Sequence, residues 1–522
     1  MQTEVVTGGT PAEFGDKSGG VVKFEVKDKK KKKEEPEPQA ITLEPVSDES
    51  YSIIVENEFK MTKNEPLSTF SADVDRAAYS NIRRFIQQGQ SVPQDAVRIE
   101  EMINYFPYNY AQPKDEHPLF ISAEYSACPW NQQNGLLRVA LKAKEMQASQ
   151  TPPSNLVFLV DVSGSMSDGN KLPLLKDAFK LLVNQLRSED KVSIVVYAGA
   201  AGLVLPSTSG ANKTAILAAL NNLQAGGSTA GGAGIELAYK TAQENFLSNG
   251  NNRVILATDG DFNVGISNQN DLQRLIEEKR KTNIFLTCLG FGMGNYKDNT
   301  LETLANKGNG NYAYIDDMSE AKKLFVEELT GTLLTVAKDV KIQIEFNPQK
   351  VAAYRLVGYE NRMLATEDFI NDAKDAGEVG AGHCVTAIYE ILPAQKDELR
   401  EEISLRYQEK IENATATQSQ EIAFVKVRYK QPKADNSVEM SKAIPYQQIR
   451  WADGSETYRS ASEDFRFAAS VAMWGLCLRK SPFVKNGDIN TVLKWAEISK
   501  GEDKGGYRAE YIELVKKQMA EK

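Results

Sequence analysis

The chain has 522 residues, of which 41% are hydrophobic and 25% charged, values typical of globular domains with sizeable cores. Its formal net charge of −9 argues against a nucleic-acid-binding protein, because binding phosphates needs a surplus of Lys and Arg on one face. Runs of about 18 apolar residues do not occur, so the sequence predicts no transmembrane helix.

Residues 1–46 are predicted to be a segment of low order that ends in a linker. The stretch KDKKKKKEEPEPQ, residues 27–39, combines a lysine block with Glu and Pro and cannot bury a hydrophobic core. Glu34, Glu35 and Glu37 neutralise the lysines, which argues against a nucleic-acid or membrane tail. The first residues lack the basic and apolar regions of a signal peptide, so we expect any leader or lipid anchor to lie upstream of this sequence.

The next two segments differ in hydrophobic periodicity. Residues 47–115 are predicted to form an N-terminal helical flank, because apolar residues recur every three or four positions in DVDRAAYSNIRRFIQQG. Gly89 ends that helix, and a second helix ends before Pro107. Residues 116–150 instead contain two strand-like runs, LFISAEYSA and LLRVALKAK, which we expect to join a β-sandwich.

Strands and helices alternate in residues 154–335, from the strand NLVFLVDVS to a helix predicted over 319–334. Near-continuous apolar strands separated by helices indicate a mostly parallel sheet with helices on both faces, a doubly wound, Rossmann-like α/β fold. In open sheets of this kind, ligands bind beyond the carboxyl ends of the strands.

The last third of the chain is predicted to be β-rich and then helical. Residues 336–455 contain the strand-like runs VKIQIEFN, CVTAIYEIL, ISLRYQ and IAFVKVRYK. We expect the α/β domain to be inserted in, or flanked by, a β-sandwich-like domain that these strands form with those of 116–150. Residues 456–522 are predicted to be a C-terminal helical segment, in which FRFAASVAMWGLCLRK is apolar on nearly all sides and should be buried.

Polar residues collect at the ends of the predicted parallel strands. Asp161, Ser163 and Ser165 follow the first strand, in DVSGS. Asp259 follows the fourth strand, and Thr229 lies in the GGSTAGG loop before a long helix. Positions 161, 163 and 165 can project oxygens to the same side while the intervening glycine lets the loop turn tightly. Two carboxylates and three hydroxyls suit a hard divalent cation, Mg²⁺ first and also Mn²⁺ or Ca²⁺, rather than a softer metal.

The segments DVSGS, GGSTAGG and ATDGDFN resemble, in order and placement, the metal-ion-dependent adhesion site of von Willebrand factor A (VWA) domains, which is familiar from integrins. The resemblance implies that Ser163, Ser165 and Thr229 coordinate the ion. It implies that Asp161 and Asp259 hold it directly or through water, and that one position stays open for an Asp or Glu carboxylate of a protein partner. Because two Asp charges only balance a divalent ion, an incoming carboxylate is attracted at close range.

The flanks of the α/β domain carry a second resemblance. The segments SADVDRAAYSNIRRFI, RIEEMINYFPYNY and DFRFAASVAMWGLCLRKSPF resemble one bacterial group of VWA proteins that has characteristic N- and C-terminal flanking regions. Members of that group are typically envelope proteins and often lipoproteins. The resemblance therefore implies a location in the cell envelope, in the periplasm or associated with the outer membrane.

The leading hypothesis is a protein-binding module without enzymatic activity, which docks an acidic group of a partner at its metal site. The alternative is a structural scaffold of the cell envelope, in which the flanking domains make the contacts and the metal only stabilises the fold. A metal-dependent hydrolase is a third hypothesis, because a bound ion can activate water, but the sequence places no general base beside the site.

Other motifs are matched only in part, and we expect no catalytic or cofactor-binding residues. The four cysteines form no CxxC pair, and two histidines leave no triad pattern. A D-x-D-x-N run that starts at Asp259 begins like an EF-hand loop, but Val264 stands where that loop needs Gly. The G-x-G-x-G run that starts at Gly290 lacks the spacing of a dinucleotide-binding fingerprint and is predicted to shape a loop.

Overall fold

The computed structural model describes residues 48–72, 75–147, 150–227, 231–260, 269–394, 419–446, 461–484 and 488–520. The predicted segment 1–46, the strand-like run at 403–408 and the candidate ligand Thr229 lie outside the described residues.

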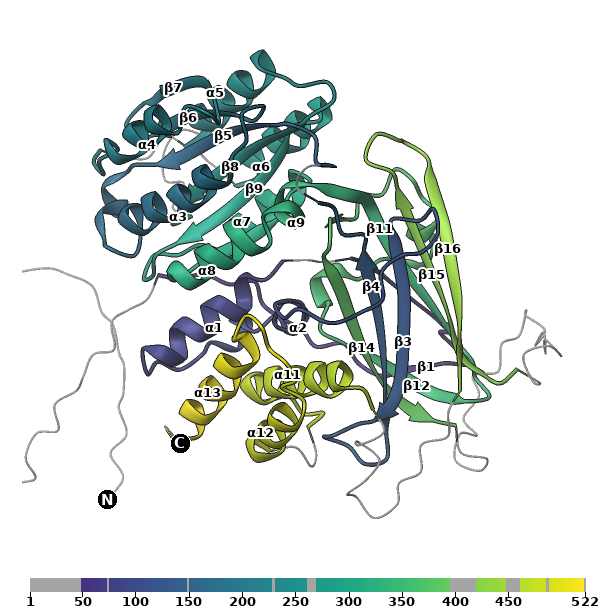
Figure 1. Cartoon of the computed structure of the whole chain (residues 1–522). Helices are drawn as coiled ribbons and strands as arrows, with labels where there is room; N and C mark the ends of the chain where they lie inside the picture. Colours follow the sequence, from purple (N-terminus) through teal and green to yellow (C-terminus); the bar gives the residue numbers. More distant parts are fainter. Residues whose placement is uncertain are drawn as a thin grey trace, which may run out of the picture. The chain divides into compact units, whose positions relative to one another are not determined.

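A six-stranded sheet forms the centre of the α/β domain, with the strand order β10-β9-β8-β5-β6-β7 (Figure 1). Its strands are β5 (Ser154–Asp161), β6 (Lys191–Tyr197), β7 (Ala201–Ser209), β8 (Asn251–Thr258), β9 (Phe285–Phe291) and β10 (Tyr312–Ile315). β5 pairs in parallel with both β6 and β8, and β9 pairs in parallel with β8 and β10. The edge strand β7 runs antiparallel to β6. The predicted doubly wound, mostly parallel sheet is thus confirmed.

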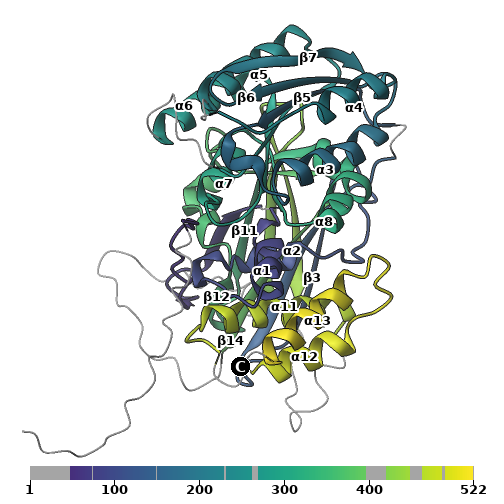
Figure 2. The ribbon, with the colours of Figure 1, turned by 90° about the vertical axis from the view of Figure 1, so that its left-hand side faces the viewer.

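Helices cover both faces of this sheet, and the alternation of side chains along β5 shows why. Leu156, Phe158 and Val160 pack on one face, and Val157 and Leu159 pack on the other. The first face carries α3 (Leu172–Gln185), α4 (Lys213–Asn221) and α8 (Met318–Lys322); the second carries α5 (Gly231–Glu244), α6 (Gln269–Lys279) and α7 (Asp298–Lys307). Figure 2 shows α6 and α7 on one side of the sheet and α3, α4 and α8 on the other. Because successive strand residues point to opposite faces, a strand covered on both sides must be apolar throughout.

The helix predicted over 319–334 differs from the observed structure, in which it has three parts. After α8 the chain forms a π-helical turn at Lys323–Glu327 and then the short helix α9 (Leu329–Leu333). The buried ammonium of Lys323 donates to the carbonyl of Tyr105 at 2.7 Å and pairs with Glu328 at 3.1 Å. The contact with Tyr105 reaches a residue 218 positions away, so local periodicity could not predict the break.

Two further sheets pack face to face and form a β-sandwich. One has the strand order β1-β12-β14-β4-β3 and the other β13-β11-β15-β16, with β2 also paired to β11. Their strands are β1 (Lys60–Met61), β2 (Leu67–Ser71), β3 (Leu119–Ala127), β4 (Gly135–Ala143), β11 (Thr335–Phe346), β12 (Val351–Val357), β13 (Gly377–Gly380), β14 (Cys384–Pro393), β15 (Glu421–Lys430) and β16 (Ser437–Pro445). Apolar residues of both sheets share one buried cluster.

The α/β domain is an insertion in this sandwich. β4 precedes the domain in sequence and β14 follows it, yet the two pair antiparallel over most of their length, from Gly135 opposite Ile391 to Lys142 opposite Cys384. The chain therefore leaves the sandwich after β4 and re-enters it at β11. This arrangement confirms the predicted fold class, in which strands from both sides of the α/β domain contribute to one sandwich.

The segment 47–115 contains strands as well as the predicted helices. α1 (Ala77–Gln87) and α2 (Ile99–Asn104) form where the periodicity predicts them, but β2 pairs antiparallel with β11 before α1 begins. The side chain of Phe70 in β2 is fully buried in the sandwich core. A five-residue strand next to Pro66 carries too little local pattern to be distinguished from a loop, and its pairing with a distant strand stabilises it.

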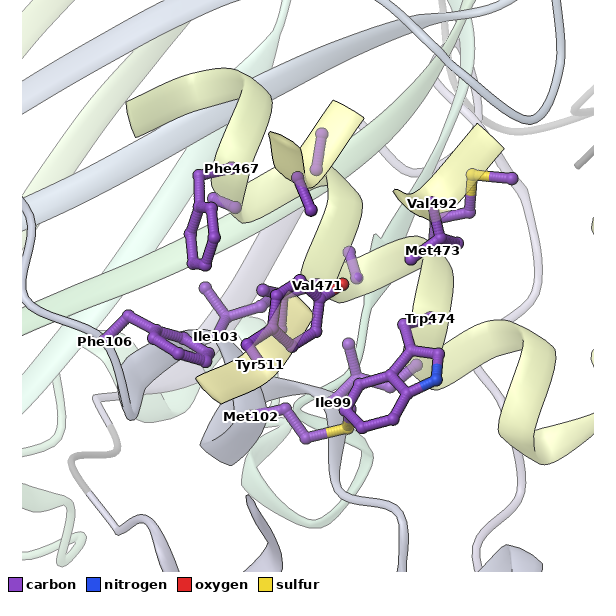
Figure 3. Packing of buried hydrophobic residues seen from close by; sticks show 14 of the residues in the cluster. Ile99, Met102, Ile103, Phe106, Phe467, Val471, Met473, Trp474, Val492 and Tyr511 are labelled. Atoms are coloured by element: carbon purple, nitrogen blue, oxygen red, sulfur yellow. The ribbon is translucent and has the colours of Figure 1, made fainter. Parts of the chain in front are cut away.

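The helices α2, α11 (Glu463–Arg479), α12 (Ile489–Ile498) and α13 (Tyr507–Ala520) share another hydrophobic core, shown in Figure 3. Phe467 and Trp474 of α11 are fully buried there, as predicted for this apolar helix. Gly475 allows the close approach of α2, because a Cβ at that position would lie 2.7 Å from the Cγ1 of Ile99. Among the described helices, none is long and apolar enough to span a bilayer.

Candidate metal-binding site

Two of the predicted metal ligands lie at the carboxyl ends of β5 and β8. Asp161 is the last residue of β5, and Asp259 directly follows β8; both are fully buried. Val160 of β5 is opposite Ala257 of β8, so the parallel pairing brings the two carboxylates to the same edge of the sheet. The structure thus places these two predicted ligands together.

Hydrogen bonds fix the carboxylate of Asp161. Its Oδ1 accepts from the backbone N–H of Ser163 at 2.9 Å. Its Oδ2 accepts from the hydroxyl of Thr258 at 2.7 Å and from that of Tyr197 at 3.3 Å. Burial raises the pKa of Asp161 and the nearby charge of Asp259 adds to this, while the bonds from Ser163 and Thr258 oppose it. Sequence analysis did not identify Tyr197, which reaches the site from the end of β6.

The two serines of DVSGS lie side by side. The Oγ atoms of Ser163 and Ser165 are 3.0 Å apart; Ser163 is buried, whereas Ser165 is partly exposed. The N–H of Gly164 donates to the carbonyl of Gly227 at 3.1 Å, which holds the loop that leads to position 229 against this turn. Thr229 itself lies outside the described residues, and its part in the site stays a prediction.

A lysine and an asparagine that sequence analysis missed contact Asp259. The ammonium of Lys171, at the start of α3, lies 3.1 Å from Oδ2 of Asp259 and donates to Oδ1 of Asn295 at 2.8 Å. The amide of Asn295 also donates to Oδ2 of Asp259, at 3.0 Å. The one sequence signal near them is the G-x-G-x-G run, which directly precedes Asn295.

That glycine run shapes the loop after β9, as predicted, and Gly292 shows how. Its φ of +81° is in the left-handed region that favours glycine, and a Cβ there would lie 2.6 Å from the Cγ of Lys171. The carbonyl of Gly292 accepts from the hydroxyl of Tyr314 at 2.6 Å. Glycine at this position therefore leaves room for the lysine stem that passes it.

The same loop is held from outside the α/β domain by residues of the N-terminal flank. The carboxylate of Glu49 accepts from the N–H of Gly294 at 2.8 Å and pairs with Arg84 of α1 at 2.8 Å. The N–H of Ser50 donates to the carbonyl of Tyr296 at 3.1 Å. The loop that carries Asn295 is thus held by contacts within the α/β domain and also by residues of the N-terminal flank.

The chemistry of the donors fits a hard cation. The side chains that meet here offer carboxylate and hydroxyl oxygens, which Mg²⁺, Mn²⁺ and Ca²⁺ prefer. In the described part of the chain, no group of three or more His, Cys, Asp or Glu side chains is arranged to hold a metal, at this site or elsewhere, so the candidate site depends on hydroxyl oxygens beside its two carboxylates. A groove of about 520 Å³ begins beside the site, where Met166 and Ser167 directly follow Ser165, and extends between α3 and the end of α4.

Three family models match this chain. "von Willebrand factor type A domain" matches residues 155–327, "von Willebrand factor" matches residues 45–138, and "Uncharacterized protein YfbK, C-terminal" matches residues 331–520. The first of these matches spans Asp161, Ser163, Ser165 and Asp259. The VWA domain expected from the motifs is therefore confirmed, and the other two models cover the flanking regions.

Individual proteins are similar over different shares of the chain. The Escherichia coli protein "Uncharacterized protein YfbK" is 43% identical over 474 residues, which is 89% of this chain and 80% of that protein. Human "Inter-alpha-trypsin inhibitor heavy chain H4" is 33% identical over 198 residues, 35% of this chain and 21% of that protein. The solved structure "von Willebrand factor type A from Catenulispora acidiphila" is 17% identical, covering 77% of this chain and 91% of that chain with a TM-score of 0.40.

Proposed function

This chain belongs to the family of the Escherichia coli protein YfbK, and from that membership and its site we propose that its VWA domain is a metal-dependent protein-binding module. VWA domains commonly mediate protein interactions. The observation that carries the proposal is the meeting of Asp161, Ser163, Ser165 and Asp259 at one edge of the sheet, although β5 and β8 are about a hundred residues apart.

The proposed ligands of the cation are Asp161, Ser163, Ser165, Thr229 and Asp259, and the proposed ion is Mg²⁺, with Mn²⁺ and Ca²⁺ as the other hard cations that suit oxygen donors. When bound, the ion supplies concentrated positive charge and a position at which a carboxylate of a partner can bind. Asp161 is held in place by the three hydrogen bonds from Ser163, Thr258 and Tyr197, so its orientation is set before a ligand arrives.

The accessible side of the site supports docking of a protein segment. Ser165 is partly exposed, and the groove that begins at Met166 and Ser167 offers room for a chain that continues away from the ion. Lys176, Asp177 and Lys180 line this groove with charged groups, whereas Leu172 and Leu223 in its lining are buried. A partner segment with an acidic residue at the metal and polar or charged residues beside it would match these features.

We propose a binding role rather than catalysis because the histidines of the chain lie elsewhere. His117 contacts the hydroxyl of Tyr429 at 2.8 Å, and His383 lies against Gly331 and Gly380. Neither is therefore in place to serve as a general base at the carboxyl end of β5. We also propose a location in the cell envelope, which rests on the resemblance of the flanks to envelope VWA proteins and which fractionation of expressing cells would check.

A scaffold role is the second candidate, and buried ion pairs between the domains favour it. Arg98, between the N-terminal helices, contacts Glu101 and also Asp298 of the VWA domain, and all three side chains are at most 5% exposed. Arg76 contacts Glu328 after the π-helical turn, and both of these side chains are only partly buried. These ion pairs hold the N-terminal flank against the VWA domain. A scaffold role requires such fixed contacts between domains.

One experiment separates the two roles. The full chain and its Asp161→Asn variant are used to capture partners from native cells, in Mg²⁺ and after chelation with EDTA. Asp271→Asn is the matched control, because Asp271 is an exposed carboxylate of the VWA domain on α6. Metal-dependent docking requires that a partner be recovered with wild type and Asp271→Asn in Mg²⁺ only. Equal recovery in all arms would reject it and leave the scaffold role.

A further inference from the structure

We infer that Lys171 is a built-in counter-charge of the metal site, which weakens the binding of the cation and leaves the loaded site positively charged toward an anionic partner. This inference rests on the proposed function, because it concerns the same cation. It extends that function by assigning the charge of the loaded site, and with it the preference for an acidic ligand, to a residue outside the predicted ligand set.

The position of the ammonium is fixed by its contacts. Lys171 reaches Oδ2 of Asp259 at 3.1 Å and Oδ1 of Asn295 at 2.8 Å, and its side chain is 4% exposed. A buried ammonium is costly unless it is paired and hydrogen-bonded, and here it has both kinds of partner. The ammonium is therefore held at the site, unlike that of a surface lysine, which contacts a carboxylate only transiently.

The surrounding chain is shaped to receive this side chain. The N–H of Lys171 donates to the carbonyl of Asp168 at 3.0 Å, so the turn after DVSGS places the lysine directly before α3. Its stem then passes Gly292, where any side chain would collide with it. Asn295, three residues later, bonds both the ammonium and Asp259. The loop after β9 thus leaves room for the stem of Lys171 at Gly292 and holds its ammonium at Asn295.

The charges lead to two consequences. Asp161 and Asp259 alone would just neutralise a divalent ion, whereas the side chains of Asp161, Asp259 and Lys171 together leave the bound ion with one net positive charge. Lys171 contacts Asp259, one of the proposed ligands. As a general guide, a positive charge roughly 6 Å from a divalent cation lowers the affinity for that cation by about tenfold at the dielectric constant of water. The same charge attracts an incoming carboxylate. The lysine therefore lowers the affinity of the site for the metal and raises the affinity of the loaded site for an anionic partner.

The test measures cation binding to the full chain by titration calorimetry with Mg²⁺ alone. The variants are Lys171→Met, which removes the charge, and Lys171→Gln, which removes the charge but can still hydrogen-bond. The matched control is Lys240→Met, because Lys240 lies on α5 of the same domain with its side chain 72% exposed. Acetate is then titrated into each Mg²⁺-loaded protein as the carboxylate probe.

We expect both Lys171 variants to bind Mg²⁺ about tenfold more tightly than wild type and to bind acetate more weakly, with Lys240→Met unchanged. Unchanged or weaker Mg²⁺ binding in both variants, or opposite effects of Met and Gln, would overturn the inference. Unchanged acetate binding would overturn its second half. If wild type and every variant fail to bind Mg²⁺, both the inference and the proposed function are rejected. Binding by the Lys171 variants alone would keep the inference while rejecting the function of the wild-type site.

Discussion

The guanidinium of Arg83 in α1 forms a two-pronged contact with the carboxylate of Asp316 after β10, at 2.8 Å from Nε to Oδ2 and 2.5 Å from Nη2 to Oδ1. Arg83 is fully buried and also contacts Glu320 at 2.8 Å and Glu510 of α13 at 3.1 Å. Burial raises the pKa of Asp316 to about 6, with Glu320 adding to the shift and Arg83 opposing it. One arginine therefore joins the N-terminal flank, the VWA domain and the C-terminal helix.

Replacing this arginine should destabilise the whole fold. Arg83→Met leaves the carboxylates of Asp316 and Glu320 buried without their cation, and we expect a loss of about 3–5 kcal/mol in the free energy of unfolding. Arg274→Met is the control, because Arg274 pairs with Asp271 at 3.8 Å with its side chain 80% exposed, and should change stability by less than about 0.5 kcal/mol. Urea unfolding measures both, and equal losses would contradict the prediction.

The buried histidine should make stability depend on pH. Burial lowers the pKa of His383 from 6.5 to about 3, and the charge of Arg76 adds to the shift. Below pH 6.5 the unfolded chain takes up a proton at this histidine and the folded chain does not, so stability present at neutral pH is lost as the pH falls toward 3. The loss approaches about 1.4 kcal/mol per pH unit, or about 2 kcal/mol by pH 5.

His383→Gln removes this titration while every other titrating group remains. Urea unfolding of wild type and variant at pH 7 and pH 5 therefore isolates the effect of His383 as the difference between the two slopes. Wild type should lose more stability than the variant over this interval, whatever the effect of the substitution on the free energy of unfolding at pH 7. Parallel profiles would show that the histidine is already protonated, or exposed, in the folded chain.

Two glycines of one loop should respond differently to alanine. Gly292 and Gly294 both have positive φ, +81° and +89°, so either substitution strains the backbone by about 1 kcal/mol. A Cβ at Gly292 would also collide with the stem of Lys171, whereas one at Gly294 meets open space. We expect Gly292→Ala to cost about 1–3 kcal/mol more in thermal unfolding than Gly294→Ala. Equal costs would show that the loop does not depend on the lysine.

A cation at the proposed site should stabilise the folded chain. Ligands that bind only the folded state add about 2.7 kcal/mol at a concentration of one hundred times Kd. Addition of Mg²⁺ should therefore raise the Tm of wild type and leave that of Asp161→Asn unchanged, with Ser163→Ala intermediate because it removes a neutral donor. Asp271→Asn should respond as wild type does, and a rise in Tm for Asp161→Asn would place the cation elsewhere.

The sequence predicted the α/β domain well because its signals are local. Each strand is a short apolar run and each helix has its own periodicity, so DVSGS could be placed at a strand end from neighbouring residues alone. The insertion in a sandwich was also predictable, since strand-like runs occur on both sides of the domain. β2 and the π-helical turn after Lys322 were not predictable, because pairing with β11 and a contact with Tyr105 stabilise them.

The sequence by itself determined that the donor oxygens of Asp161, Ser163, Ser165 and Asp259 follow the ends of parallel strands, because each apolar strand and the polar residues after it form a local pattern. Only the tertiary structure decided what surrounds them. Lys171 and Asn295 are 88 and 36 positions from Asp259, and no spacing rule joins them to it. Folding brings their charge and hydrogen bonds to the carboxylate, because the loop after β9 closes over the start of α3 with glycine where the lysine passes.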